Sequence, residues 1–205
     1  MRRKLPRAFF NRPTLDVSRD LIGKYLVSHL DGARRAARIV EVEAYIGEDD
    51  PASHAAPGPT KRNAPMYGKP GIAYIYFIYG MYYCLNVVTE AQGQPAAVLF
   101  RAAEPSGGFE TVESKGHRVL SLSGPGKLCR GFGLTKAHNN LDLTGSQLYL
   151  EDRGERPALI SRSTRIGIRK GTDRKWRFFD AGSCAVSGRS GKSAIASVRK
   201  MRVKR

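Results

Sequence analysis

The chain has 205 residues, of which 41% are hydrophobic, and it carries a formal net charge of +17. This length suits one hydrophobic core, and no apolar run approaches the roughly 18 to 20 residues that a membrane helix needs, so we do not expect a membrane protein. Three widely spaced cysteines without a CxxC pair argue against a disulfide framework, and four histidines without metal-ligand spacing predict no metal site.

The first 13 residues are basic and show no hydrophobic periodicity, which predicts a flexible arm. Neither a long apolar stretch nor a small-residue cleavage site follows, so we expect no secretory signal. The expected location is the cytoplasm, with association with the nucleoid if the source is bacterial. Residues 14–23 (TLDVSRDLIG) then predict a short helix that begins near Thr14 and ends at Gly23.

Residues 24–30 and 33–45 predict a β-hairpin, because Asp31-Gly32 between the two strand-like segments favours a tight turn. Successive side chains of a strand point to opposite faces, which divides the second strand into an apolar set and an acidic and aromatic set. The apolar set is Val40, Val42 and Ala44, and the other set is Glu41, Glu43 and Tyr45.

The two acids Glu41 and Glu43 share a face, with their Cβ atoms expected roughly 6 to 7 Å apart. A carboxylate held in a pocket beside aromatic rings is partly desolvated, which raises its pKa and suits it to act as a general base near neutral pH. The alternative is a solvated face, or an ion pair with one of the many arginines. Spacing alone favours this alternative and does not separate the two acids.

Residues 46–71 form a long segment that is rich in Gly, Pro and polar residues. A loop of this length within a compact domain is usually functional or disordered. Because it contains His54, Arg62 and Asn63 and is flanked by two strong strand patterns, we expect a functional loop.

Residues 73–80 and 81–90 predict a second hairpin, with Gly80 in the turn. Tyr74 and Tyr76 share one face of the first strand, while Phe77, on the other face, is expected in the core. Tyr79 immediately precedes the turn, where side chains project from the fold. An exposed aromatic ring on a basic protein can enter a base stack, which suggests contact with nucleobases.

Further along the chain, residues 96–105 predict a strand on which Leu99 and Arg101 share a face, and residues 123–134 predict a helix. We also expect a mobile loop at 105–118 and strands at 148–151, 163–168 and 176–180. Strand patterns dominate, so the expected fold is α+β, a single domain with a curved antiparallel β-sheet core and surrounding helices. Its expected limits are a basic flexible arm at 1–13, the domain at 14–187 and a basic, disordered tail at 188–205.

Positive charge is concentrated near the end of the chain, where residues 161–205 carry 14 Lys and Arg against two Asp. Such a field is typical of proteins that bind polyanions, because neutralised phosphates release condensed counterions. For the last residues the alternative is a tail that only aids solubility. Charge alone separates neither DNA from RNA nor an enzyme from a packaging protein.

Several segments together resemble a bacterial-type member of the alkyladenine (3-methyladenine) DNA glycosylase family. They are IVEVEAYIGEDDPASHA, KRNAPMYGKPGIAYIYFIYGMYYCLNVV, AVLFRAAEP, SGPGKLCRGFGLT and RIGI, in the order of the family across roughly residues 15–187. This combination is far more specific than any single short motif. The resemblance implies a base-excision repair enzyme that flips out alkylated or deaminated purines and hydrolyses the N-glycosidic bond by water attack, leaving an abasic site.

The resemblance also implies roles for residues of the reaction centre. Glu43 matches the general base that deprotonates the water attacking C1′ of the deoxyribose, and Arg101 matches a residue that helps to hold this water. The backbone near Val186 matches a carbonyl that contacts the same water, although GSCAVS is an inexact match here.

For DNA binding, the resemblance implies a base-binding pocket and an intercalating wedge. Tyr79 matches the wedge that enters the minor groove and fills the space left by the flipped nucleotide. Asn86 matches a residue that helps to reject guanine. The full pocket set is Tyr45, His54, Tyr76 and Asn86.

No lysine stands out within the pocket motifs, so we expect a monofunctional glycosylase that needs no cofactor and forms no Schiff base. Lys127 is the nearest candidate for the opposite view, and we assign it, with Arg62 and Arg130, to contacts with the DNA backbone. The expected partner is double-stranded DNA containing a damaged purine, bound by a monomer without a metal or a membrane.

Two alternatives compete with a glycosylase. A non-catalytic nucleic-acid-binding protein with an aromatic sheet would explain the charge and the tyrosines. It gives no reason for Glu41 and Glu43 on a base-binding face, where phosphates would repel them. The second alternative is a small-molecule enzyme of a related α+β fold with an unrelated basic tail.

Overall fold

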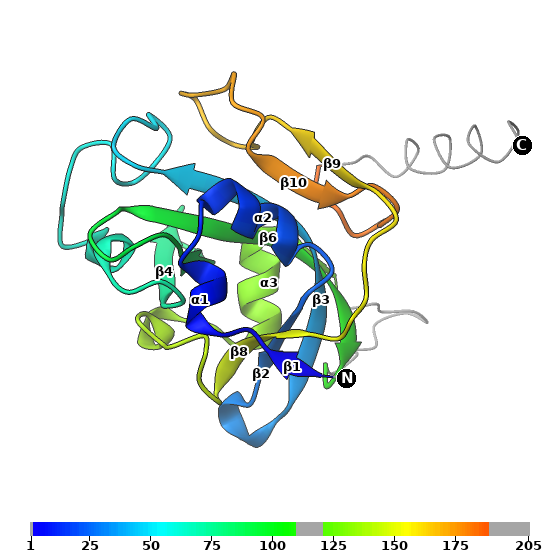
Figure 1. Cartoon of the computed structure of the whole chain (residues 1–205). Coiled ribbons are helices and arrows are strands. Elements are labelled where there is room, and N and C mark those ends of the chain that lie inside the picture. The colour runs from blue at the N-terminus through cyan, green and yellow to red at the C-terminus, as the bar shows by residue number, and fades with distance from the viewer. Residues whose placement is uncertain (1, 110–120, 189–205) are drawn as a thin grey trace, which may run out of the picture.

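The fold is a single α+β domain built around one antiparallel sheet, as expected from the sequence (Figure 1). The computed structural model describes residues 2–109 and 121–188, and none of the helices in these ranges is both long and apolar enough to cross a membrane. The helices are α1 (Arg7–Phe10), α2 (Thr14–Leu21) and α3 (Pro125–Phe132), with 3-10 turns η1 (Leu30–Gly32), η2 (Ala64–Tyr67) and η3 (Lys136–His138). The strands are β1 (Arg3–Lys4), β2 (Tyr25–Ser28), β3 (Arg35–Ile46), β4 (Ala73–Ile78), β5 (Tyr82–Val88), β6 (Ala96–Gly107), β7 (Leu122–Ser123), β8 (Leu148–Asp152), β9 (Ile160–Ser163) and β10 (Arg177–Asp180).

The sheet is centred on the two longest strands, β3 and β6, which pair with each other. The strand order is β1-β8-β2-β3-β6-β5-β4, and β10 pairs with a further part of β3 and carries β9 on its outer side. Figure 1 shows β9 and β10 together beside the C-terminal half of β3. The predicted hairpins β2–β3 and β4–β5 are therefore confirmed as antiparallel pairs.

The register between β3 and β6 shifts at three places, and two of these irregularities are adjacent β-bulges on either side of Glu41. Ile39 lies opposite Ala103, Glu41 opposite Ala102 and Val42 opposite Phe100. The register therefore skips Val40 on β3 and Arg101 on β6. Bulges re-aim side chains and are common beside active sites, and here they bring the Arg101 side chain against both acids of β3.

These bulges also correct an expectation from simple alternation. Val42 packs in the main core, whereas Val40 belongs to a separate small cluster with Ala102, Phe179 and Val186. The two valines therefore do not share one apolar face, because the extra residue in the ladder changes the face on which Val40 projects.

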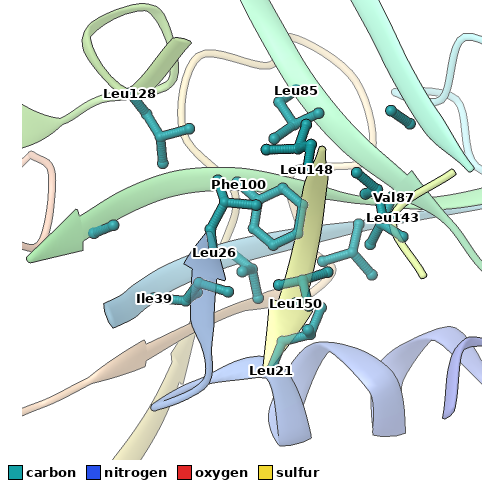
Figure 2. Packing of buried hydrophobic residues seen from close by; sticks show 14 of the residues in the cluster. Leu21, Leu26, Ile39, Leu85, Val87, Phe100, Leu128, Leu143, Leu148 and Leu150 are labelled. Atoms are coloured by element: carbon teal, nitrogen blue, oxygen red, sulfur yellow. The ribbon is translucent and has the colours of Figure 1, made fainter. Parts of the chain in front are cut away.

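The main core lies between the curved sheet and the helices α2 and α3. Phe100 is fully buried and, in Figure 2, lies in the middle of the labelled aliphatic side chains. Val17 and Leu21, four residues apart on α2, present one apolar face to this core, as a helical period requires. Leu128 and Phe132 do the same from α3.

The predicted helices at 14–23 and 123–134 are both confirmed, with ends set by local chemistry. Pro125 occupies the first turn of α3, where its missing N–H costs nothing, and Gly133 ends the helix in the left-handed conformation. Strands β8 and β10 confirm the expectations for 148–151 and 176–180.

Three further expectations about the elements differ from the structure. Residues 2–13 do not form a flexible arm: β1 pairs with β8, and Leu5 and Phe10 are buried in the main core. Residues 164–168 are not a strand, because Gly167 adopts a φ of 77° that interrupts an extended chain. Residues 105–107, expected in a loop, continue β6. Residues 110–118 of that predicted loop and the predicted tail from residue 189 onward lie outside the residues that the structure describes.

Replacing the central aromatic ring should test how closely packed this core is. We expect Phe100→Ala to lower the free energy of unfolding by about 3 to 5 kcal/mol, because it removes a buried ring and leaves a cavity. Urea unfolding followed by circular dichroism measures this change. Leu159→Ala, at an exposed leucine, is the control and should change it by less than about 0.5 kcal/mol. Equal effects of the two substitutions would contradict the described packing.

Candidate active site

A cavity of about 690 Å³ opens where β3, β4, β5 and β6 meet the loop after β3, the N-terminus of α3 and the segment after β9. Aromatic and cationic side chains both contribute to its lining. The aromatic and histidine side chains that line it are Tyr45, His54, Tyr74, Tyr76, Tyr79 and Tyr82. The lining cations are Arg101, Lys127, Arg130, Arg169 and Lys170.

The base of the site follows one row of partners across the sheet. Glu43 on β3 lies opposite Leu99 on β6, which lies opposite Asn86 on β5, which in turn lies opposite Tyr74 on β4. Residues directly opposite each other in a sheet project to the same side. Four strands therefore contribute side chains to one side of the sheet, and Arg177 on β10 continues the row beyond Glu43.

Glu43 is fully buried and is held by three donors. The Tyr45 hydroxyl donates to Oε2 at 2.9 Å, Arg101 Nη1 donates to the same oxygen at 3.3 Å, and the Ile166 N–H donates to Oε1 at 2.7 Å. Burial raises the pKa of Glu43, and these three donors only partly oppose that effect. The result is a carboxylate with raised proton affinity whose three donors all line the cavity.

Glu41 is equally buried but faces a different set of partners. Its Oε1 accepts from Arg101 Nε at 3.1 Å, Arg177 Nε at 2.6 Å and the Ser187 hydroxyl at 2.8 Å. Its Oε2 accepts from the Ser187 N–H at 2.6 Å. Of these donors only Arg101 lines the cavity, so the structure distinguishes two acids that sequence spacing left equivalent.

One wall of the cavity is formed by His54 and the tyrosines of β4. The Tyr74 hydroxyl and Nδ1 of His54 share a hydrogen bond of 2.8 Å, and the Tyr76 ring lies edge-on to the imidazole, with 4.5 Å between ring centroids. Burial, with a smaller effect from the nearby Arg62 guanidinium, lowers the pKa of His54 to about 4. Burial also raises the pKa of Tyr74 to about 12. Both rings are therefore uncharged near neutral pH.

The loop that carries His54 is tied down by Asn63, a buried residue. Its amide nitrogen donates to the carbonyls of His54 at 2.7 Å and Gly58 at 2.9 Å, and its side-chain oxygen accepts from the Thr60 N–H at 2.6 Å. A side chain that satisfies backbone groups in this way fixes loop geometry. The long polar segment is thus an ordered wall of the cavity.

The Arg165 guanidinium packs over the Tyr45 ring, and no sequence motif had indicated this residue. The Arg165 side chain is fully buried, forms a two-pronged ion pair with the fully buried Asp50, and lies 4.7 Å from the centre of the Tyr45 ring. Both oxygens of the carboxylate are used, as in other paired guanidinium–carboxylate contacts. Because Arg165 and Asp50 are 115 residues apart, no local pattern could have indicated the pair.

The tip of the β4–β5 hairpin is a tight turn at Tyr79 and Gly80, which have φ values of 54° and 67°. Two consecutive positive φ angles fit the mirror-image turns that match the twist of a hairpin, but they strain a tyrosine. Tyr79 is 75% exposed and Met81 is 62% exposed. Phe77, expected in the core, is also 47% exposed and packs on Tyr83, with ring centroids 4.9 Å apart.

The remaining predicted residues are distributed around the cavity. The buried Asn86 lines it and donates to the Tyr74 carbonyl at 2.9 Å. Lys127 and Arg130 line it from α3, whereas the exposed Arg62 does not line it but lies 5.7 Å from the Tyr76 ring. Val186 is buried in a small apolar cluster and is absent from the cavity lining, although the peptide that joins it to Ser187 contacts Glu41.

Two further features concern thiols and metals. Cys84 lines the cavity next to Tyr76, and burial raises its pKa. Within residues 2–109 and 121–188, no group of three or more His, Cys, Asp or Glu side chains is arranged to hold a metal ion.

Comparison with known proteins finds one family that covers most of the chain. Residues 8–184 match the model of the family described as methylpurine-DNA glycosylase. A protein of Methanocella arvoryzae is 52% identical over 196 residues, covering 91% of this chain and 96% of its own. Proteins of Alkaliphilus oremlandii (44% identical, 86% and 95% covered) and Wolbachia pipientis wMel (48% identical, 88% and 93% covered) are also similar. All three bear the name "Putative 3-methyladenine DNA glycosylase".

The depressed pKa of His54 gives a direct test of the wall geometry. In an NMR titration of the folded protein, the His54 ring should titrate near pH 4, and in urea it should return to its ordinary value near 6.5. Between these values the unfolded chain binds a proton that the folded chain does not, so stability should fall as the pH falls from 6.5 toward 4. A folded-state midpoint above 6 would contradict the buried, neutral ring.

Proposed function

The chain belongs to the methylpurine-DNA glycosylase family, and we propose that its cavity receives a damaged purine flipped out of double-stranded DNA. As a family member it is a monofunctional DNA glycosylase of base-excision repair, a hydrolase of N-glycosyl bonds. The observation that carries the proposed mechanism is the position of Glu43: it is fully buried, with raised proton affinity, beneath an aromatic cavity of about 690 Å³.

The aromatic walls fit the energetics of base flipping. Extruding a nucleotide costs a few kcal/mol in lost stacking and pairing, and least at a damaged pair. Stacking on Tyr45 and Tyr76 can offset this by roughly 1 to 3 kcal/mol per base. A methylated purine that carries positive charge gains further from the electron-rich faces of these rings. Asn86 and the neutral His54 supply the polar contacts that can discriminate among purines.

In the proposed reaction, the oxygen of a water molecule attacks C1′ as the bond from C1′ to the purine nitrogen breaks. The bonding electrons leave with the base, and Glu43 takes the proton of the water. As a carboxylate, Glu43 also stabilises the positive charge that develops on the sugar. A purine that is already cationic leaves as a neutral base and needs no added proton, whereas a neutral purine such as hypoxanthine must also be protonated as it leaves.

Arg101 and the backbone near Val186 are proposed to help hold this water. For Arg101, two observations support this proposal: its Nη1 lies 3.3 Å from Glu43 Oε2, and its side chain lines the cavity. The proposal for the Val186 carbonyl rests on the family resemblance, because Val186 is buried beside the site and not in its lining.

Contacts with the DNA outside the cavity are proposed for the hairpin tip and the surrounding cations. Tyr79, exposed and raised on its tight turn, is the proposed wedge that fills the gap left by the flipped nucleotide. Arg62, Lys127 and Arg130 lie around the cavity, where they can pair with phosphates. Recognition of a single damaged site needs only one such surface, so we propose that the chain acts as a monomer.

Substitution of the general base tests the reaction directly. With enzyme in excess over a duplex that contains one hypoxanthine or ethenoadenine, Glu43→Gln should slow base release about 10²- to 10⁴-fold while retaining lesion binding. Released bases are detected as strand breaks that appear only after hot alkali. Glu48→Gln, at an exposed carboxylate nearby, should leave the rate unchanged. Release by Glu43→Gln at the wild-type rate would rule out this role.

The wedge can be tested by binding alone. Tyr79→Ala should weaken affinity for a lesion duplex by about 1 to 3 kcal/mol, the value of one stacked ring, and should weaken single-strand binding less. Fluorescence anisotropy on both DNAs measures the difference. Leu159→Ala removes another exposed apolar side chain and serves as the control. Equal losses on the duplex and the single strand would count against a wedge.

A further inference from the structure

We propose that Glu41 is a positioning residue for the reaction, which orients Arg101 and the 186–187 peptide beside Glu43. This inference rests on the proposed function of Glu43. Neither acid is itself among the lining residues, but all three donors to Glu43 line the cavity, whereas Arg101 is the only donor to Glu41 that does. Glu41 would therefore act through the groups that it holds.

The first of these groups is Arg101. Its Nε donates to Glu41 at 3.1 Å, while Nη1 on the same guanidinium donates to Glu43 at 3.3 Å. A guanidinium is planar and rigid, so fixing Nε also fixes the direction of Nη1. The Ser187 hydroxyl, itself a donor to Glu41, lies 3.4 Å from Nε and 3.3 Å from Nη2. Glu41 therefore determines the direction from which Arg101 contacts Glu43.

Sharing Arg101 between two carboxylates also affects the chemistry of Glu43. If Glu41 were uncharged, Arg101 would pair with Glu43 alone and stabilise its ionised form more strongly. Glu43 would then take a proton from water less readily. The negative charge of Glu41 thus keeps Glu43 basic in spite of the adjacent arginine.

The second group is the backbone at residues 186–187. The Ser187 N–H donates to Glu41 Oε2 at 2.6 Å, and the Ser187 carbonyl accepts from Arg177 Nη2 at 2.9 Å. In a trans peptide the carbonyl of Val186 points away from the N–H of Ser187. Fixing that N–H on Glu41 therefore fixes the direction of the Val186 carbonyl, the other group proposed to contact the water.

A purely structural role is the competing explanation, because removing one partner of a buried ion pair is strongly destabilising. The geometry supplies a distinction. Any buried carboxylate could form the ion pairs that Glu41 forms with Arg101 and Arg177. Of these two arginines, only Arg101 also forms an ion pair with Glu43. A positioning residue must therefore change the rate of the chemical step in folded protein, and part of its effect must require Arg101.

The main experiment compares Glu41→Gln with wild type at a temperature where both are folded. We expect base release to slow by about 10- to 100-fold in single turnover, with affinity for a duplex containing a tetrahydrofuran abasic analogue within about threefold. Glu151→Gln is the matched control, since Glu151 is also buried and paired, with Arg153 at 2.7 Å, but lies outside the cavity lining. A wild-type rate for Glu41→Gln, or an equal loss in the control, would overturn the proposal.

A double-mutant cycle tests whether Glu41 acts through Arg101. In an Arg101→Ala background, Glu41→Gln should cause a smaller loss than it causes in the wild type, because one of the two groups that it positions is gone. Fully additive losses would show that the two residues act independently and would refute the positioning role. If Glu41→Gln does not fold, Ser187→Ala removes one hydroxyl donor without changing any charge, and a several-fold loss of rate is expected.

The pH profile provides a readout that a structural role would not move. In Glu41→Gln the acid limb of the release rate should shift to lower pH, because Arg101 then stabilises the ionised Glu43 alone. An unchanged limb would contradict the proposal. The charged and titratable groups around Glu43 are Glu41, Tyr45, Cys84, Arg101, Arg165 and Arg177.

A final measurement separates failure of this inference from failure of the proposed function. The Arg101 Nε–H resonance, assigned with Arg101→Lys, should exchange slowly in wild type and in Glu43→Gln, and rapidly in Glu41→Ala, which removes the acceptor oxygen. This readout needs no catalysis. A wild-type protein that releases no damaged purine would refute the proposed function, whereas a protected Nε–H in Glu41→Ala would refute only the role of Glu41.

Discussion

Two fully buried carboxylates on one strand impose the constraint on which the site depends. Glu41 and Glu43 are out of water and close together, so their charges must be balanced by donors that the fold delivers to the same place. Strand β6 delivers Arg101 through a bulge, β10 delivers Arg177, and the segments after β9 and β10 deliver backbone N–H groups. The bulges in β3 and β6 and the paths of the segments after β9 and β10 meet this requirement. Both carboxylates are surrounded by protein donors, but only those of Glu43 all line the cavity.

Much of the fold follows from local patterns, and the exceptions have physical causes. The hairpins were predictable because Asp31-Gly32 and Gly80 allow the positive φ angles of tight turns, and η1 and the β4–β5 tip show such angles at these positions. The packing of residues 2–13 was not predictable, since two buried side chains among arginines and prolines show no period. The paired bulges were equally hidden, because a strand that carries an extra residue reads in sequence like one that does not.

The sequence indicated more of the residues around the cavity than of the contacts between them. Motif resemblance selected Glu43 over Glu41, and the structure gives that choice a geometric basis, since all three donors to Glu43 line the cavity. The supporting pairs escaped prediction: Arg165 with Asp50, and Arg177 with Glu41, are each separated by more than 100 residues. Only tertiary packing brings such partners together, so no spacing rule applies to them. The segment expected as a strand at 163–168 instead supplies the Ile166 N–H to Glu43.

The burial that shapes the cavity also governs the reactivity of its wall. Cys84 lies among the lining residues, and a thiol attacks electrophiles as the thiolate. Because burial raises the pKa of Cys84, the group stays protonated near neutral pH and is a poor nucleophile. Chemicals that methylate purines are themselves electrophiles that consume thiolates. The recess proposed to receive a methylated base would therefore also shield its own sulfur from the agents that create such bases.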